Sequence, residues 1–225
     1  MRLTHEQALE QVRSARLIAI LRHVPAEQVL PTAEALLRGG VKALEFTFDH
    51  DSPADLQVNA EKIRRTAEHF GRELLLGCGT ALTAEEVEAA HEAGASLVIS
   101  PNVSEAVIRR SRALGMVSMP GALTPTEIVT AWEAGADIVK LFPAGELGVG
   151  YIKAVRGPLA HIPMAAVGGV KPENVGAFLD AGVCGFGVGG PLVLADALKR
   201  GDYAAIEARA AEFTAAVAAW EAEHA

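Results

Sequence analysis

The sequence predicts an α/β protein folded as a (β/α)8 (TIM) barrel with an extra N-terminal helix. Eight short apolar segments alternate with helical segments, glycine-rich or polar turns separate them, and no G-x-G-x-x-G motif follows the first strand to favour a doubly wound sheet. The chain of 225 residues is near the short end of the size range of such barrels, so one domain over residues 1–225 is expected. The predicted strands are residues 17–21, 43–48, 74–77, 96–100, 116–119, 137–141, 163–167 and 184–188.

The helices are predicted from their caps and their turn residues. A polar helix is expected over residues 5–14, and a second helix over about 25–38 ends at Gly39-Gly40. The third helix, about 52–68, is expected to have Ser52 as its N-cap and Pro53 at its first position. Further helices are predicted at about 83–93, 104–113, 124–134, 149–156, 172–181 and 194–199.

The Ala-rich tail, residues 202–223, is predicted to be a helix with one apolar face. Ile206, Phe213, Val217 and Trp220 recur at helical spacing along it. This face is expected to pack against the barrel or against a neighbouring subunit.

Composition excludes several classes of partner. The formal net charge is -8, and the only basic run is Arg109-Arg110-Ser111-Arg112, which argues against nucleic acid and against acidic membranes. Cys78 and Cys184 lack the paired spacing of a zinc site or a disulfide framework and are expected to be reduced thiols. No apolar run approaches the ~18 residues of a membrane span. A soluble, cytoplasmic protein is therefore expected.

A single lysine lies near the end of the sixth predicted strand, in the segment from Ala136 to Pro143. Because side chains alternate along a strand, Lys140 points away from Leu141, which is expected in the packed layer. A lysine that is desolvated in this way has a lowered pKa, and its neutral amine is a nucleophile. The alternative is a strand-end lysine whose amine extends to water.

Polar residues at the carboxyl ends of the strands define a candidate site, because function gathers there in (β/α)8 barrels. Arg22 ends the first strand, Glu45 lies in the second, and Thr80 follows the third. The apolar neighbours of Glu45 should pack against helices, so its carboxylate is expected to point inward and to meet Lys140. The alternative is that Glu45 is only a buried charge partner of Lys140.

Two glycine pairs follow the last two strands. Gly168-Gly169 and Gly189-Gly190 lie where barrels commonly hold a phosphate with backbone N–H groups. Ordinary turn glycines are the alternative. Thr80 is either a hydrogen-bond donor to a substrate carboxylate or a cap of the helix that follows it.

His50 lies between Asp49 and Asp51, a pattern that suggests a metal ligand set. These residues precede a predicted helix start, where acidic residues are favoured for electrostatic reasons, and the other histidines are scattered. No metal site and no cofactor are expected.

Short motifs spread over nearly the whole chain carry a family resemblance. They are Ile18-Ala19-Ile20-Leu21-Arg22, Glu45 with Thr47, Gly77-Cys78-Gly79-Thr80, Ser100-Pro101-Asn102, Pro120-Gly121 with Thr124-Pro125-Thr126-Glu127, Lys140-Leu141-Phe142-Pro143 and Val167-Gly168-Gly169-Val170. With these motifs the sequence resembles the class I pyruvate aldolases that cleave 2-keto-3-deoxy-6-phospho sugar acids. This family includes enzymes that act on the phosphogluconate acid, the phosphogalactonate acid and 4-hydroxy-2-oxoglutarate.

The resemblance implies a homotrimeric barrel in which Lys140 forms a Schiff base with pyruvate or the keto acid. It also implies that Glu45 moves protons, that Thr80 helps to hold the carboxylate, and that Pro101 and Phe142 shape the pocket. The resulting hypothesis is a lyase that reversibly splits a 2-dehydro-3-deoxy-6-phosphohexonate into pyruvate and D-glyceraldehyde 3-phosphate. One alternative is a barrel isomerase or epimerase that uses Lys140 and Glu45 as acid and base, and another is a non-catalytic sugar-phosphate binding barrel.

Three positions depart from the gluconate type of this family. Asp49 replaces an arginine that grips the pyruvate carboxylate, and Arg22 is the predicted substitute. Val167 replaces a threonine and, like Ser100-Pro101-Asn102, resembles the galactonate type, whereas Thr47 resembles the gluconate type. Pro191 replaces a frequent serine, so the phosphate contact there lacks both a hydroxyl and an N–H.

Overall fold

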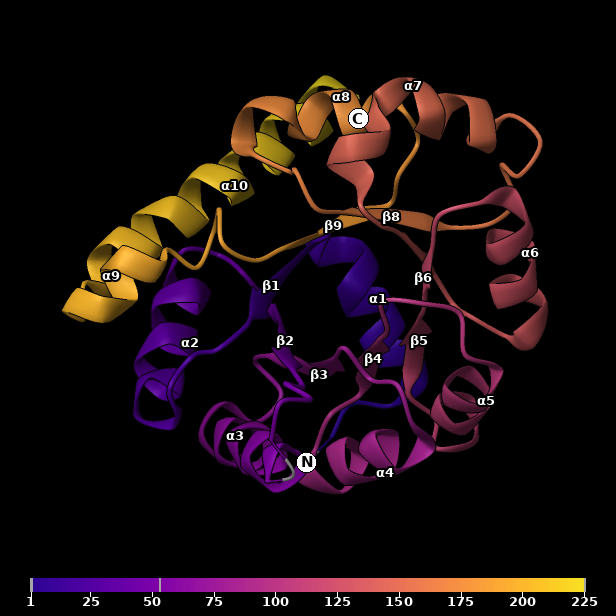
Figure 1. The fold of residues 1–225 in the computed structure, drawn as a ribbon. Coiled ribbons are helices and arrows are strands. Elements are labelled where there is room, and N and C mark those ends of the chain that lie inside the picture. The colour runs from indigo at the N-terminus through magenta and orange to yellow at the C-terminus, as the bar shows by residue number, and fades with distance from the viewer. Residues whose placement is uncertain (1, 53, 225) are drawn as a thin grey trace.

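A computed structural model describes residues 2–52 and 54–224, which form a barrel of parallel strands surrounded by helices (Figure 1). The strand order is β5-β4-β3-β2-β1-β9-β8-β7-β6, and every recorded pairing is parallel. The strands are β1 (Leu17–Leu21), β2 (Ala43–Thr47), β3 (Leu75–Gly79), β4 (Leu97–Ile99), β5 (Val117–Met119), β6 (Gly121–Ala122), β7 (Val139–Leu141), β8 (Met164–Val167) and β9 (Gly185–Val188).

The sheet has nine strands among the described residues, one more than predicted, because a proline divides one strand position of the barrel into β5 and β6. β5 pairs with β4, β6 pairs with β7, and only Pro120 separates β5 from β6. Proline has no N–H for the ladder, so the strand is divided there, although the Pro120 carbonyl still accepts a 2.9 Å hydrogen bond from the Lys140 N–H. The two short strands together occupy the fifth position of an eight-stranded barrel.

The barrel wall separates two apolar clusters. The interior cluster contains Ile18, Leu75, Leu97 and Ile138, while the larger cluster between the sheet and the helices contains Val139 and Leu141 among many others. The division follows the two-residue period of the strands. Because Ile138 is interior and Leu141 is exterior, the predicted inward direction of Lys140 is confirmed.

Helices surround the barrel wall, as predicted from the sequence, and the first of them lies across one end of the barrel. They are α1 (His5–Ala15), α2 (Val29–Arg38), α3 (Asp55–Phe70), α4 (Ala84–Ala93), α5 (Glu105–Ala113), α6 (Pro125–Ala134), α7 (Ala144–Arg156), α8 (Val175–Asp180), α9 (Ala195–Arg200) and α10 (Tyr203–Glu223), with 3-10 turns η1 (Ala26–Gln28) and η2 (Pro172–Asn174). No helix within residues 2–52 and 54–224 is long and apolar enough to cross a membrane.

Two predicted helix starts are wrong. Helix α3 begins at Asp55 with Ala54 as N-cap, and Ser52 instead accepts a 3.3 Å hydrogen bond from the Ala54 N–H; Pro53 lies outside the described residues. Helix α7 begins at Ala144, five residues earlier than predicted, but Gly148 inside it has φ 73° and ψ 166°. The predicted helix corresponds to the part of α7 after this glycine, which interrupts the helical backbone.

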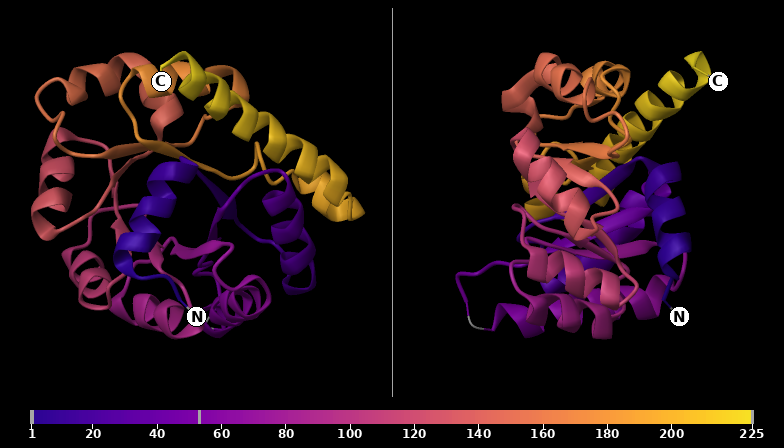
Figure 2. Two further views of the ribbon diagram at one scale, coloured as in Figure 1. Left: turned by 180° about the vertical axis from the view of Figure 1, so that it is seen from behind. Right: turned by 90° about the vertical axis from the view of Figure 1, so that its right-hand side faces the viewer.

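Helix α1 closes the end of the barrel opposite the carboxyl ends of the strands (Figures 1 and 2). Its buried residues Ala8 and Val12 join the interior cluster. At its start, His5 Nε2 lies 2.9 Å from Asp137 Oδ1, and the other carboxylate oxygen accepts from the Ser118 N–H at 2.8 Å. The barrel is therefore plugged at this end, and a ligand must enter from the other.

Helix α10 packs along the barrel as predicted, against α2 and α8. Arg38 on α2 pairs with Glu207 at 2.7 Å, and Trp220 donates to Asp180 on α8 at 2.8 Å. Phe213 is fully buried in the outer apolar cluster. This helix therefore spans the junction where the first strand meets the last.

We expect Phe213→Ala to lower the free energy of unfolding by about 3–5 kcal/mol, because it leaves a cavity under α10. Urea unfolding followed by circular dichroism measures this change. The exposed Ala215→Ser on the same helix is the control, with an expected effect of about 0.5 kcal/mol or less. A loss for Phe213→Ala as small as the control would show that α10 is not part of the cooperative fold.

Candidate active site

A cavity of about 570 Å³ opens at the carboxyl ends of the strands, and it brings together every residue nominated from the sequence. β1 contributes Ile20, with Arg22 directly after it, and β2 contributes Glu45. The remaining nominated residues on its wall are Thr80, Pro101, Lys140, Phe142, Val167, Gly168, Gly169, Gly189 and Gly190. Residues that are far apart in sequence thus meet because parallel strands end at one rim.

Lys140 presents a desolvated amine to this cavity. Only 6% of the residue is exposed, and burial lowers its pKa from the usual 10.5. The Glu45 carboxylate opposes this shift, while the positive charge of Arg22 adds to it. The amine also lies 4.8 Å from the centre of the Phe142 ring. Such an amine carries less charge at neutral pH than an exposed lysine and is a better nucleophile.

Glu45 is the buried carboxyl group of the cavity. It is 2% exposed, and burial raises its pKa, while the charges of Lys140 and Arg22 act in the opposite direction. Among the described residues it has no ion pair within 4 Å, and its Oε2 has no hydrogen-bond partner. A buried carboxyl oxygen without a hydrogen-bond partner indicates either that the carboxyl group is protonated or that a ligand binds to it.

Gly79 makes the position of Glu45 possible. A Cβ atom at residue 79 would overlap the Glu45 carboxylate and the carbons that carry it. Gly77 and Gly79 stand on the same face of β3, and Gly79 is paired in register with Thr47 of β2. The two glycines therefore leave room inside the barrel where larger side chains would fill it.

Arg22 and Thr80 form a polar pair on the cavity wall. Arg22 donates from Nη2 to Thr80 Oγ1 at 3.2 Å. Since the hydroxyl oxygen accepts this bond, its hydrogen remains available to a ligand. Helix α4 is capped by Thr83, which accepts from the Glu86 N–H, so Thr80 is not the helix cap.

The glycine pairs line the part of the cavity between β8 and β9. Gly168 and Gly169 have φ values of 91° and 72°, in the left-handed region that favours glycine. Gly169 also lies so close to Gly145 on α7 that a Cβ on either residue would approach the other's Cα within 2.7 Å. The missing side chains leave backbone groups accessible at this wall, as an anion site requires.

Sequence reasoning missed a set of contacts at the rim. His50 Nε2 lies 3.0 Å from the Thr80 carbonyl and its Nδ1 lies 3.3 Å from Glu86, while His23 Nδ1 lies 3.1 Å from Asp49. No cluster of three or more metal-ligating side chains occurs within the described ranges. These contacts join loops that are distant in sequence, and only the unusual polar run around His50 hinted at them.

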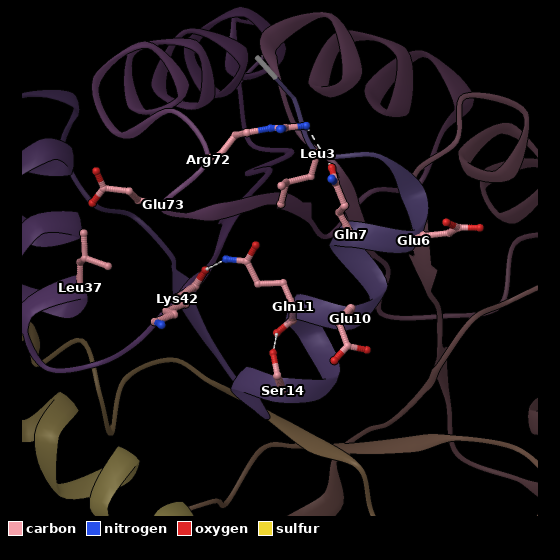
Figure 3. Close-up of a pocket in the computed structure, with 10 residues that line it drawn as sticks. All are labelled: Leu3, Glu6, Gln7, Glu10, Gln11, Ser14, Leu37, Lys42, Arg72 and Glu73. Carbon is pink, nitrogen blue, oxygen red and sulfur yellow. Dashed lines mark hydrogen bonds between the residues drawn. The ribbon is translucent and has the colours of Figure 1, made fainter.

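A larger hollow of about 800 Å³ lies at the opposite end of the barrel, beside α1 (Figure 3). Some of its polar side chains bind one another and the nearby backbone: Gln11 donates to the Lys42 carbonyl at 3.0 Å, and Arg72 donates to Gln7 at 3.0 Å. Its residues precede β2 and β3 or lie on α1, so they are remote from the amine of Lys140. Neither Lys140 nor Glu45, the buried ionisable groups of the first cavity, lines this hollow.

A buried amine and a neighbouring carboxyl group in one cavity of a (β/α)8 barrel fit the class of lysine-dependent aldolases of class I. Residues 9–209 match the family model for KDPG and KHG aldolase, and the chain belongs to this family. It is an aldehyde-lyase.

Curated relatives and solved structures agree with this assignment. The chain is 38% identical over 177 residues to the 2-dehydro-3-deoxy-6-phosphogalactonate aldolase of Escherichia coli (strain K12), covering 78% of this chain and 83% of that one. It is 33% identical over 181 residues to the KHG/KDPG aldolase of the same organism, covering 79% and 80%. A solved structure described as native KDPGal superposes with a TM-score of 0.80 at 37% identity, covering 91% and 95%.

We expect Gly79→Ala to reduce kcat/KM for aldol cleavage by about 100-fold, because the new methyl group displaces the carboxyl of Glu45. The measurement is steady-state cleavage coupled to detection of pyruvate, with circular dichroism to establish folding. Gly150→Ala is the control, since a Cβ there meets no atom within 4 Å. A folded Gly79→Ala variant with normal kinetics would show that the position of Glu45 is unimportant.

Proposed function

We propose that this protein reversibly cleaves a 2-dehydro-3-deoxy-6-phosphohexonate to pyruvate and D-glyceraldehyde 3-phosphate through a Schiff base at Lys140. The observation that carries the proposal is that one cavity holds both a desolvated amine and a buried carboxyl group, one oxygen of which has no hydrogen-bond partner among the described residues. The family relatives whose names include these substrates support the substrate class.

Chemically, the amine of Lys140 attacks the C2 carbonyl of the keto acid, and loss of water leaves a protonated imine. The imine withdraws electrons, so the C3–C4 bond breaks to an enamine instead of an unstabilised carbanion. The C4 hydroxyl loses its proton as this bond breaks and becomes the aldehyde carbonyl. Protonation of the enamine at C3, followed by hydrolysis of the imine, then releases pyruvate and the free amine.

Glu45 is the proposed proton carrier in these steps. Because its pKa is raised, Glu45 keeps its proton up to a higher pH than an exposed glutamate does. A group whose pKa is near the working pH transfers protons most efficiently. It accepts the C4 hydroxyl proton, directly or through a water, and returns a proton to the enamine. Gly79 leaves the space in which this carboxyl moves between the two positions.

Arg22 and Thr80 are the proposed receptor for the keto-acid carboxylate. The guanidinium supplies positive charge, and the hydroxyl that accepts its bond supplies a donor. Arg22 thus takes over the role of the arginine that the gluconate type of the family usually has at the position of Asp49. Asp49 itself lies against His23, at the exposed rim.

The backbone of Gly168, Gly169, Gly189 and Gly190 is the proposed phosphate site. All four residues line the same cavity as Lys140, and Pro191 lies beside them without an N–H to contribute. Pro101 and Phe142 shape the remaining wall.

For the C4 configuration we favour the phosphogalactonate acid. Val167 at the end of β8 is buried and lines the cavity, so this wall offers a methyl group where a threonine would offer a hydroxyl. The relatives named for the phosphogalactonate acid include one from Rhizobium meliloti at 39% identity. Homotrimer assembly stays a prediction of the family resemblance, and cytoplasmic location stays a prediction from the absence of a long apolar run in the sequence.

We expect borohydride with pyruvate to attach a three-carbon unit irreversibly to Lys140, detected by peptide mass analysis. An isomerase, an epimerase or a passive binding barrel leaves the lysine unmodified. Only the neutral amine reacts with pyruvate. At a low pyruvate concentration, the labelling rate should therefore rise with pH and reach its plateau at a pH below 10.5, the ordinary pKa of a lysine. Lys140→Met is the control, and labelling of that variant, or a plateau above 10.5, would contradict the proposal.

We expect Val167→Thr to shift the ratio of kcat/KM for the galactonate acid to that for the gluconate acid by about tenfold toward gluconate, because a hydroxyl then faces C4. The ratio is measured with both epimers on one preparation. Val98→Thr on β4 is the matched control, since it makes the same exchange at a buried strand valine that does not line the cavity. An unchanged ratio for Val167→Thr would remove this residue from the account of specificity.

A further inference from the structure

His50 lies in the segment that follows β2, which projects from the open end of the barrel (Figure 2). Both nitrogens of its ring face acceptors. Nε2 lies 3.0 Å from the carbonyl oxygen of Thr80, and Nδ1 lies 3.3 Å from a carboxylate oxygen of Glu86 on α4. A carbonyl oxygen only accepts, so Nε2 carries the N–H of the hydrogen bond to Thr80. A neutral ring would then turn the lone pair of Nδ1 toward the Glu86 carboxylate, whereas a ring protonated at both nitrogens forms an ion pair with it.

Thr80 has a backbone conformation that is rare for threonine. Its φ is 55°, in the left-handed region, which a β-branched side chain rarely adopts. Its two neighbours are fixed to adjacent strands, because the Gly79 carbonyl accepts from the Phe48 N–H at 2.8 Å and the Ala81 N–H donates to Ile99 at 3.3 Å. The carbonyl of Thr80 itself is held by His50. Strain of this kind persists only where the surroundings impose it.

Glu86 is fixed independently of His50. One of its carboxylate oxygens accepts from the backbone N–H groups of Leu82 and Thr83 at 2.6 and 3.0 Å, in the capping box of α4. The other oxygen faces His50. Helix α4 therefore provides a rigid anchor, and the ring of His50 connects that anchor to Thr80.

We propose that His50 is a positioning residue, which as an imidazolium bridges Glu86 and the Thr80 carbonyl and thereby holds the Thr80 hydroxyl against Arg22. It touches neither Lys140 nor the reacting carbons. Its effect is on the orientation of the Arg22–Thr80 pair, so the inference rests on the proposed role of that pair in binding the keto-acid carboxylate. The aspartates that flank His50 in sequence, Asp49 and Asp51, do not contact its ring among the described residues.

The test compares His50→Leu, which removes both donors, with His50→Gln, whose amide nitrogen can donate to the Thr80 carbonyl in place of Nε2. We expect His50→Leu to raise the KM for pyruvate in the condensation reaction by about tenfold, the effect of one lost charged hydrogen bond. The kcat and the KM for glyceraldehyde 3-phosphate should change less than about threefold. His50→Gln should restore most of the affinity for pyruvate.

Asp51→Asn is the matched control, because it removes a charge from the same segment and should leave the KM for pyruvate unchanged. Arg22→Ala is the reference for full loss of carboxylate recognition, and should raise this KM more than His50→Leu does. A normal KM in folded His50→Leu, or equal impairment of the Leu and Gln variants, would overturn the proposal.

Nitrogen NMR of the imidazole decides the protonation state without any turnover. In the wild-type protein both ring nitrogens of His50 should carry protons, with the signal assigned by its absence in His50→Gln. Glu86→Gln keeps the helix cap but presents an amide N–H to Nδ1, so His50 should become neutral with its proton on Nε2. A neutral wild-type ring would overturn the proposal even if His50→Leu does not fold.

The same measurements separate this inference from the proposed function. If borohydride and pyruvate leave the wild-type protein unlabelled, the Schiff-base reaction fails. The nitrogen signals of the His50 ring then still report whether the bridge exists. If labelling succeeds and the ring is neutral, the function stands and only the role of His50 is lost.

Discussion

Everything in the active site depends on the cost of placing two ionisable groups, Lys140 and Glu45, inside a barrel that offers few compensating bonds. Burial moves the pKa of the amine down and that of the carboxyl up, and each charge partly offsets the shift of the other. A closely bonded ion pair would hold both groups in their charged forms. Lys140 and Glu45 form no recorded ion pair within 4 Å, so in the proposed mechanism one group is able to attack and the other to exchange a proton.

The barrel keeps this arrangement through the small residues around it. Gly77 and Gly79 leave space beside Glu45, and Gly187 on β9 is close enough to Val167 that a Cβ would come within 2.9 Å of its side chain. Below them the large interior residues such as Leu75, Leu97 and Ile138 fill the barrel. The interior is therefore packed toward α1 and hollow toward the carboxyl ends, which places the reacting groups at the boundary between hydrocarbon and solvent.

The sequence predicted the barrel, the inward direction of Lys140 and most residues of the cavity, because strand alternation and strand-end position are local properties. Pro101 and Phe142 came only from the family resemblance. The prediction errors have equally local causes. Nothing in the residue pattern shows that α3 begins at Asp55, three residues after Ser52, or that Gly148 interrupts α7 without ending it. The contacts of His50 were out of reach for another reason: they require knowing which loops meet at the rim.

Helix α10 has a consequence for the cooperativity of the fold. It binds residues on both sides of the β1–β9 junction, including Arg16 just before β1 and Pro191 just after β9, through Glu221 and Arg209. Detachment of α10 would break both of these contacts and would expose the apolar surface of α2 and α8 beneath it. Local unfolding of this helix is therefore expected to loosen the closure of the barrel between its first and last strands.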